Sequence, residues 1–378
     1  MQSDRLGWGL AALFVIGSLF PSRLTAQEAQ AHSTPRGVVC LVTLDSMEAV
    51  LARDYSGYSS RLPHDSAAYR ALTDSVRAVA GTSDDYHVCI PALQRITRFF
   101  RDRHLMIWQS APPEPAPSGD SGVAKPPARS SPAAVDSSVW PSVRRLDDST
   151  ALIRIPDLAW RLEPVIDSVL SAHWTELLAT PYLIIDMRGN SGGCTCSYHA
   201  LLPLLYVSPI KQPRVEVWTS PANVAMYRRW SADPTFPADA KASIDSILPT
   251  MTAHPNQFVV LAPATEIRLD TIFPRPRRIA VLVDSGCASS CEDFVLAARQ
   301  SFKVTVMGTS HTAGYLGYGN LRGVWLPGWR RMMMPTTRFP ELNASDIGYD
   351  GIEPEVLIPK GEPDPVEFAR RYLRSSNP

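Results

Sequence analysis

The stretch RIAVLVDSGCASSCEDFVLAAR, residues 278–299, decides the fold that we expect for this 378-residue chain. It begins with Ile279–Val283, an apolar run rich in β-branched residues that is typical of a buried parallel strand. Small residues then form a turn, and an apolar pattern with helical spacing begins at Phe294. Ser289 therefore lies where the turn becomes a helix, and its hydroxyl can face a cleft beside the unpaired amides of the first helical turn.

Two interpretations of Ser289 follow from this stretch alone. Serine hydrolases present a nucleophilic hydroxyl in such a strand–turn–helix setting, and the next amide, here that of Ser290, helps to bind the oxyanion. Ser289 and Glu292 are also spaced as a capping box, which needs no chemistry. The rest of the chain decides between catalysis and capping.

Composition and the amino terminus indicate where the protein works. The formal net charge is zero, which gives no reason to expect a nucleic-acid partner. Arg5, the apolar segment 10–20 and the small-residue site at 24–26 predict a signal peptide over residues 1–26. The apolar segment is shorter than the roughly 20 residues of a membrane span. We therefore expect an exported protein, periplasmic or extracellular, with an uncleaved anchor as the alternative.

The six cysteines predict disulfides in an exported chain. They are Cys40, Cys89, Cys194, Cys196, Cys287 and Cys291. We expect a Cys40–Cys89 bond, with the other four bonded among themselves. Their close spacings would also suit a four-thiolate zinc site, but an oxidising compartment favours disulfides. We therefore expect neither a metal nor another cofactor.

Patterning after the signal peptide divides the chain into three parts. Residues 35–108 have helix-like apolar spacings and predict a small helical subdomain that ends in a strand. His104 stands just before that strand; a lone histidine is usually structural, but its ordinary pKa also suits a general base. Residues 109–138 are rich in Pro, Ala, Ser and Gly and predict an extended linker. Residues 139–378 form the main domain.

A strand, a helix and a second strand over residues 151–186 predict a right-handed parallel crossover. The second strand runs into a glycine turn that contains Gly192 and Gly193. Glycines serve where the backbone turns sharply or approaches a ligand closely. No phosphate-binding fingerprint is present, so the turn either serves a site or simply precedes a helix.

Three motifs in these segments resemble the C-terminal-processing (tail-specific) serine peptidase family. LIIDMRGNSGG at 183–193 is similar to the family's strand ending in D-x-R-x-N-x-G-G. VLVDSGCASSCEDF at 281–294 is similar to the nucleophile segment, in which the reactive serine lies three residues before a glutamate. GIEPEV at 351–356 resembles the closing motif. The resemblance implies an α/β fold with a crotonase-like core of ββα units, a peptide or protein substrate, and Ser289 as nucleophile.

The chain departs from the family in its base. Bacterial processing peptidases place a lysine in the loop that reads GTSHTAGY here, at 308–315, where no lysine occurs. This loop is similar to that of the tricorn core, in which a histidine near the start of the domain is the base. RDRHLMI at 101–107 resembles that element, so His104 is the expected base and His311 the alternative. The linker occupies the place where processing peptidases carry a PDZ domain.

The resemblance also implies the remaining site residues. Gly348 stands where tricorn-like enzymes carry the orienting acid, so we expect Asp346 or Asp350 to replace it. The amide of Ser290 and an amide of the Gly192–Gly193 turn would bind the oxyanion, and we expect a disulfide between the two turns. A non-catalytic ligand-binding relative is the alternative function. An acyl-CoA enzyme with the same core is disfavoured because thioesters are cytoplasmic.

Overall fold

The structure, a computed structural model, describes residues 39–110, 140–236, 238–343 and 347–375. The predicted signal peptide, nearly all of the predicted linker and Asp346 lie outside these residues. Among the described helices, none combines the length and the apolar character that crossing a bilayer requires.

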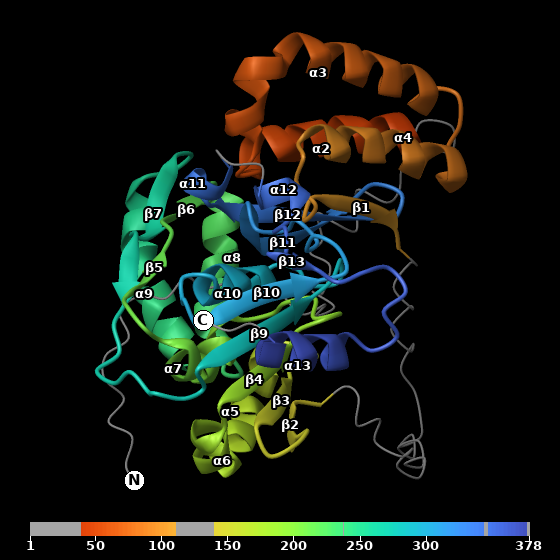
Figure 1. Cartoon of the computed structure of the whole chain (residues 1–378). Coiled ribbons are helices and arrows are strands. Elements are labelled where there is room, and N and C mark those ends of the chain that lie inside the picture. Colours follow the sequence, from red (N-terminus) through yellow and green to blue (C-terminus); the bar gives the residue numbers. More distant parts are fainter. Residues whose placement is uncertain (1–38, 111–139, 237, 344–346, 376–378) are drawn as a thin grey trace, which may run out of the picture.

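A six-stranded sheet forms the centre of the main domain, in the order β13-β10-β9-β4-β3-β2 (Figure 1). Its strands are β2 (Ser142–Arg145), β3 (Thr150–Arg154), β4 (Tyr182–Asp186), β9 (Arg278–Val283), β10 (Val304–Gly308) and β13 (Val356–Leu357). Neighbours from β13 to β3 run parallel, and β2 is antiparallel at one edge. Because β4 and β9 are parallel neighbours, the turns that follow them meet at the same edge of the sheet.

Helices cover both faces of this sheet, as a buried parallel sheet requires. Ile279, Val281 and Val283 of β9 face one core and Ala280 and Leu282 face the other, as strand alternation demands. The first face packs against α5 (Glu163–Ala172), η3 (Thr195–Leu201), α7 (Leu202–Leu205) and α10 (Ser290–Ala298). The second packs against α13 (Pro365–Ser375). Short helices η2 (Trp160–Leu162) and α6 (Trp174–Ala179) flank α5.

A second sheet of the main body is antiparallel. It runs β1 (Met106–Gln109), β12 (Arg330–Arg338), β6 (Val215–Trp218) and β7 (Phe258–Ala262), with β11 (Tyr318–Leu326) also paired to β12. Helices α8 (Pro221–Ala232) and α9 (Ala238–Ala253) share a core with it, and β5 (Ile210–Gln212) pairs β8 (Thr265–Ile267) nearby. Residue pairs such as Ile107 and Met332 join the two sides of the linker.

The N-terminal helices α2 (Val39–Asp54), α3 (Tyr58–Ala80) and α4 (Tyr86–Phe99) lie over this second sheet (Figure 1). The predicted Cys40–Cys89 disulfide joins α2 to α4. Buried residues of the helices share one core with Leu326, Met332 and Met334 of β11 and β12. The helices are therefore packed into the main body.

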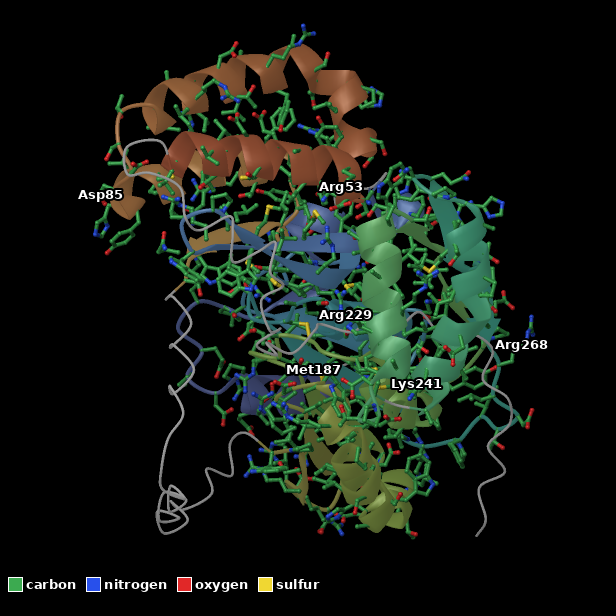
Figure 2. The ribbon with its side chains drawn as sticks, turned by 180° about the vertical axis from the view of Figure 1, so that it is seen from behind. Arg53, Asp85, Met187, Arg229, Lys241 and Arg268 are labelled. Carbon is green, nitrogen blue, oxygen red and sulfur yellow. A yellow bond between two sulfur atoms is a disulfide. The ribbon has the colours of Figure 1, made fainter. Side chains whose placement is uncertain are left out.

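A buried ionic network fixes the junction between α2, β11 and α8. Asp54, fully buried at the end of α2, pairs with Arg53 at 2.7 Å and with Arg322 of β11. Arg322 Nε donates to Asn223 Oδ1 of α8 at 3.0 Å, and Asn223 Nδ2 donates to the Asp54 carbonyl at 2.8 Å. Arg53 lies where the helices meet the rest of the chain (Figure 2). Because buried charges need their partners, this network fixes how the helices sit.

Candidate active site

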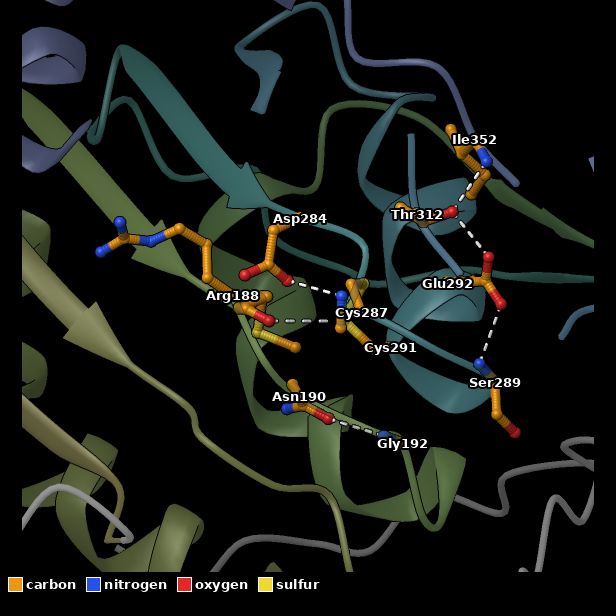
Figure 3. The surroundings of a disulfide bond; sticks show 12 residues. Arg188, Asn190, Gly192, Asp284, Cys287, Ser289, Cys291, Glu292, Thr312 and Ile352 are labelled. Carbon is orange, nitrogen blue, oxygen red and sulfur yellow. Dashed lines mark hydrogen bonds between the residues drawn. A yellow bond between two sulfur atoms is a disulfide. The ribbon is translucent and has the colours of Figure 1, made fainter. Parts of the chain in front are cut away.

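The turn after β9 holds Ser289 in an unusual conformation. Ser289 has φ 57° and ψ −119°, a backbone conformation that costs a non-glycine residue about 1–3 kcal/mol. Its side chain is 1% exposed, and its hydroxyl has no well-formed hydrogen bond to a described residue. The hydroxyl stands apart from the surrounding hydrogen bonds in Figure 3. Strain together with an unpartnered hydroxyl is typical of a nucleophile.

Glu292 forms the capping box with Ser289 and also binds a distant loop. The Ser289 amide donates to Glu292 Oε2 at 2.9 Å in the capping-box arrangement. The same carboxylate accepts from Thr312 Oγ1 at 2.6 Å, from the Gly314 amide at 2.7 Å and from the Tyr315 amide at 2.7 Å. Burial raises the pKa of Glu292, and the four donors oppose that shift. Glu292 thus joins the nucleophile turn to the loop at 312–315 (Figure 3).

The closing motif meets the same loop. The Ile352 amide donates to Thr312 Oγ1 at 2.7 Å, and the Thr312 amide donates to the Ile352 carbonyl at 3.1 Å. A Cβ at Gly351, where φ is +83°, would lie 2.2 Å from the Thr312 carbonyl oxygen. The third motif therefore supports the loop that Glu292 holds.

The glycine turn after β4 lies directly against the nucleophile turn. A Cβ at Gly192, where φ is +93°, would lie 2.5 Å from the Ala288 carbonyl oxygen and 2.9 Å from the Ser290 nitrogen. The Gly192 amide already donates to Asn190 Oδ1 at 2.9 Å. The amides of Ser290 and Gly193 donate to no other described residue. These two amides are therefore the ones left to bind an oxyanion.

Hydrogen bonds hold the two turns together. Asn190 is fully buried; its Nδ2 donates to the Ile155 carbonyl at 2.9 Å, and its own carbonyl accepts from the Ala288 amide at 3.0 Å. Ser290 Oγ donates to the Gly193 carbonyl at 2.9 Å. Asn190 is the asparagine of the first motif, and its sequence position alone predicted no role for it.

His104 reaches this site from before the linker. It is 3% exposed, and its ring packs edge-on against Tyr315, with centroids 4.8 Å apart. Tyr315 and Ser289 both donate their amides to the same oxygen of Glu292. His104 Nδ1 has no hydrogen-bond partner in the described residues. Burial lowers the pKa of His104 to about 4, against the opposing effect of the Tyr318 carbonyl, so the imidazole is neutral at pH 7.

With this geometry in view, comparison with known proteins gives the family. Residues 149–358, more than half of the chain, match the family described as Peptidase family S41. The chain belongs to peptidase family S41. This confirms the resemblance to the C-terminal-processing peptidases and makes the protein a peptidase-family hydrolase. No curated protein sequence matches this S41 peptidase.

Solved structures support the predicted α/β fold class. Mature CPAF complexed with lactacystin is 14% identical, with 85% of this chain and 94% of that chain covered and a TM-score of 0.55. Mature CPAF alone is also 14% identical, with 85% and 93% covered and a TM-score of 0.53. A lipoprotein from Streptococcus agalactiae is 14% identical, with 90% and 97% covered and a TM-score of 0.44. At this identity the two CPAF structures show the fold of the S41 peptidase.

The expected disulfide between the two turns of the S41 peptidase is wrong. The structure pairs Cys194 with Cys196 and Cys287 with Cys291, each within its own turn. The zinc alternative is excluded by the same bonds, because all four sulfurs are oxidised. Each disulfide stiffens one turn, and hydrogen bonds join the two turns to each other.

Asp102 is a residue of the site that the sequence analysis missed. Its buried carboxylate accepts from the Tyr55 hydroxyl at 2.7 Å and from the His104 amide at 2.9 Å. Burial raises the pKa of Asp102 to about 7, and these donors oppose the shift. Asp102 positions the backbone that carries His104. In sequence it was one of several charged residues, and nothing marked it as buried.

No hydrogen bond or ion pair joins His104 to Asp350 or His311 in the part of the S41 peptidase that the structure describes. Asp350, on α12 (Ile347–Asp350), is half-exposed and pairs with Arg101 at 3.5 Å. His311 is exposed, whereas the next residue, Thr312, is buried. Since the acceptor that interacts with the imidazole is the Tyr318 carbonyl, an orienting role for Asp350 remains only a prediction.

Proposed function

We propose that this S41 peptidase is an exported serine peptidase that hydrolyses peptide bonds through an acyl-enzyme on Ser289. One observation carries the proposal: Ser289 Oγ and His104 Nδ1 are both buried, and neither has a well-formed hydrogen bond to a described residue. The Ser289 amide donates directly to Glu292. The His104 ring packs against Tyr315, whose amide donates to the same carboxylate. Two such atoms in one small region are expected of a nucleophile and its base.

The proposed reaction follows from these positions. Neutral His104 takes the proton of Ser289 Oγ as that oxygen attacks the peptide carbonyl, and it then returns the proton to the leaving amine. The amides of Ser290 and Gly193 bind the oxyanion, and Gly192 permits their close approach. Water then hydrolyses the ester.

A fluorophosphonate probe tests the proposal on the purified protein. The probe should label the wild type and Ser246→Ala, a change of an exposed helical serine, but not Ser289→Ala. Labelling should be lost in His104→Ala and kept in His311→Ala. A folded wild type that resists the probe would instead favour the non-catalytic binding relative.

The pH dependence of kcat/KM should report the buried imidazole. Because burial lowers the pKa of His104 to about 4, the base stays neutral well below pH 6.5 and protonates only near pH 4. Activity should therefore be level from neutral pH down to mildly acidic pH, with half of the activity lost near pH 4. Circular dichroism at each pH controls for unfolding. An acid limb centred near 6.5 in folded protein would mean that His104 is solvated or is not the base.

A further inference from the structure

The three disulfides of the S41 peptidase differ in how accessible they are. Two of them join cysteines that are 0% exposed: Cys40–Cys89 and Cys287–Cys291. In the third, Cys194 is 6% exposed and Cys196 is half-buried. Thiol–disulfide exchange requires a thiolate to reach one of the two sulfur atoms. A reductant should therefore reach the Cys194–Cys196 bond before it reaches the other two.

The Cys194–Cys196 bond also closes the smallest loop. Its cysteines are 2 residues apart in sequence, compared with 4 for Cys287–Cys291 and 49 for Cys40–Cys89. In the chain-entropy description, a disulfide stabilises a protein more when it closes a longer loop. Opening Cys194–Cys196 should therefore change the free energy of unfolding least, and its effect should be confined to its own turn.

The hydrogen bonds around this disulfide indicate which sulfur atom leaves when the bond opens. The Cys196 amide donates to Cys194 Sγ at 3.2 Å. A thiolate that attacks the half-buried Cys196 displaces Cys194 Sγ, and the Cys196 amide already points at the sulfur atom that becomes negatively charged. Because a stabilised thiolate is a better leaving group, this arrangement favours opening by attack on Cys196.

The disulfide lies directly beside a proposed oxyanion donor, the amide of Gly193. Leu158 holds the backbone on both sides of this residue: its amide donates to the Gly192 carbonyl at 3.1 Å, and its carbonyl accepts from the Cys194 amide at 2.7 Å. A Cβ at Gly193, where φ is +146°, would lie 2.2 Å from the Leu158 carbonyl oxygen. The direction of the Gly193 amide therefore depends on where Cys194 lies.

The disulfide ties Cys194 to a helix that is fixed independently. Cys196 belongs to η3, and Tyr198 of the same helix donates its hydroxyl to Asp293 Oδ2 of α10 at 2.6 Å. Tyr198 and Asp293 are both buried. Because this bond anchors η3 to the helix that follows Ser289, the closed disulfide holds Cys194 in register with the nucleophile turn.

We infer that Cys194–Cys196 is a reversible thiol–disulfide exchange site through which a dithiol controls the peptidase. This inference rests on the proposed function, in which the Gly193 amide helps to bind the oxyanion. With the bond closed, that amide is held beside the amide of Ser290. With the bond open, Cys194 loses its link to η3, the Gly193 amide is no longer held in one direction, and acylation of Ser289 slows.

The exchange is a two-electron reduction of the protein by the dithiol. One thiolate of the dithiol attacks Cys196 Sγ to form a mixed disulfide, and the bonding electron pair leaves with Cys194 Sγ. The second thiolate of the dithiol attacks its partner sulfur in the mixed disulfide and releases Cys196 Sγ. Both released thiolates take up protons, and the dithiol becomes a cyclic disulfide. A disulfide oxidant closes the bond again by the reverse steps.

Stepwise reduction of the purified protein with dithiothreitol tests the inference. At each concentration, alkylation and peptide mass spectrometry identify the cysteines that have become thiols, and the rate of fluorophosphonate labelling reports the reactivity of Ser289. Cys194 and Cys196 should be alkylated while the other four cysteines stay bonded. The labelling rate should then fall by about tenfold or more, with unchanged circular dichroism, and glutathione disulfide should restore it.

Cys194→Ser with Cys196→Ser should label at the slow rate at every concentration of dithiothreitol. The inference alone would be overturned by a wild-type rate in this double variant, or by an unchanged rate once Cys194–Cys196 has opened. Opening of a buried disulfide first, no opening in folded protein, or a loss that reoxidation does not reverse would overturn it as well. The titration of the wild type decides the matter even where the double variant does not fold. Failure of the oxidised wild type to label would instead overturn the proposed function.

Discussion

Replacing Ser289 by alanine should lower kcat/KM for peptide hydrolysis by about 10⁴-fold or more, with little change in the free energy of unfolding. The hydroxyl has no well-formed hydrogen bond to lose, and alanine bears the same strain at φ 57°. Removal of Oγ therefore breaks no well-formed hydrogen bond to a described residue. Steady-state kinetics and urea unfolding, measured on the same preparations, give both quantities.

The capping interpretation predicts the opposite pair of results. If Ser289 only caps α10, its replacement by alanine would lower the free energy of unfolding of the protein by about 1 kcal/mol, and hydrolysis would continue. Ser246→Ala on α9 is the matched control, because it removes an exposed hydroxyl far from the turn in sequence. Hydrolysis retained in a destabilised Ser289→Ala protein would therefore rule out Ser289 as nucleophile.

Local sequence predicted much of the fold because the strands of the parallel sheet are short apolar runs. Residues 279–283 and 182–186 were both expected as buried strands, and both are. Parallel neighbours bring their ends to one edge, but it was the family resemblance, and not the pattern of either strand, that implied that the two turns meet. Ser289 could be located because it is the residue at which the turn after the strand becomes the helix.

The pattern of residues along the chain could not predict which distant strands pair with each other. The strand after His104 was expected, but nothing local specifies that Ile107 lies opposite Met332. Disulfide partners are likewise a matter of distance in the folded chain, so the pairing of Cys287 with Cys291 was missed. Asp102 was missed because burial, not residue type, gives it a role.

The antiparallel sheet explains how a residue before the linker can serve a site formed after it. β1 begins two residues after His104 and pairs with β12 over four residues. The helices that precede it are anchored by Asp54 and by a shared core. The position of the proposed base thus depends on the N-terminal helices.

Gly192→Ala should lower kcat/KM by about 10²- to 10³-fold, the usual effect of losing an oxyanion donor. The added Cβ would lie 2.5 Å from the Ala288 carbonyl oxygen and 3.0 Å from Ser289 Cβ. Since contacts under 3.0 Å are forbidden, one of the two turns must move, and the amides of Ser290 and Gly193 would separate. Steady-state kinetics and the rate of fluorophosphonate labelling should fall together.

Gly361→Ala separates this clash from the strain of the backbone. Gly361 has φ +97°, close to the +93° of Gly192, but nothing lies within 4 Å of its added Cβ. Both substitutions therefore carry a similar conformational cost, about 1–2 kcal/mol of stability, and only Gly192→Ala disturbs the two turns. Equal activity losses in the two variants would show that general destabilisation is the cause; full activity in Gly192→Ala would mean that the oxyanion is bound elsewhere.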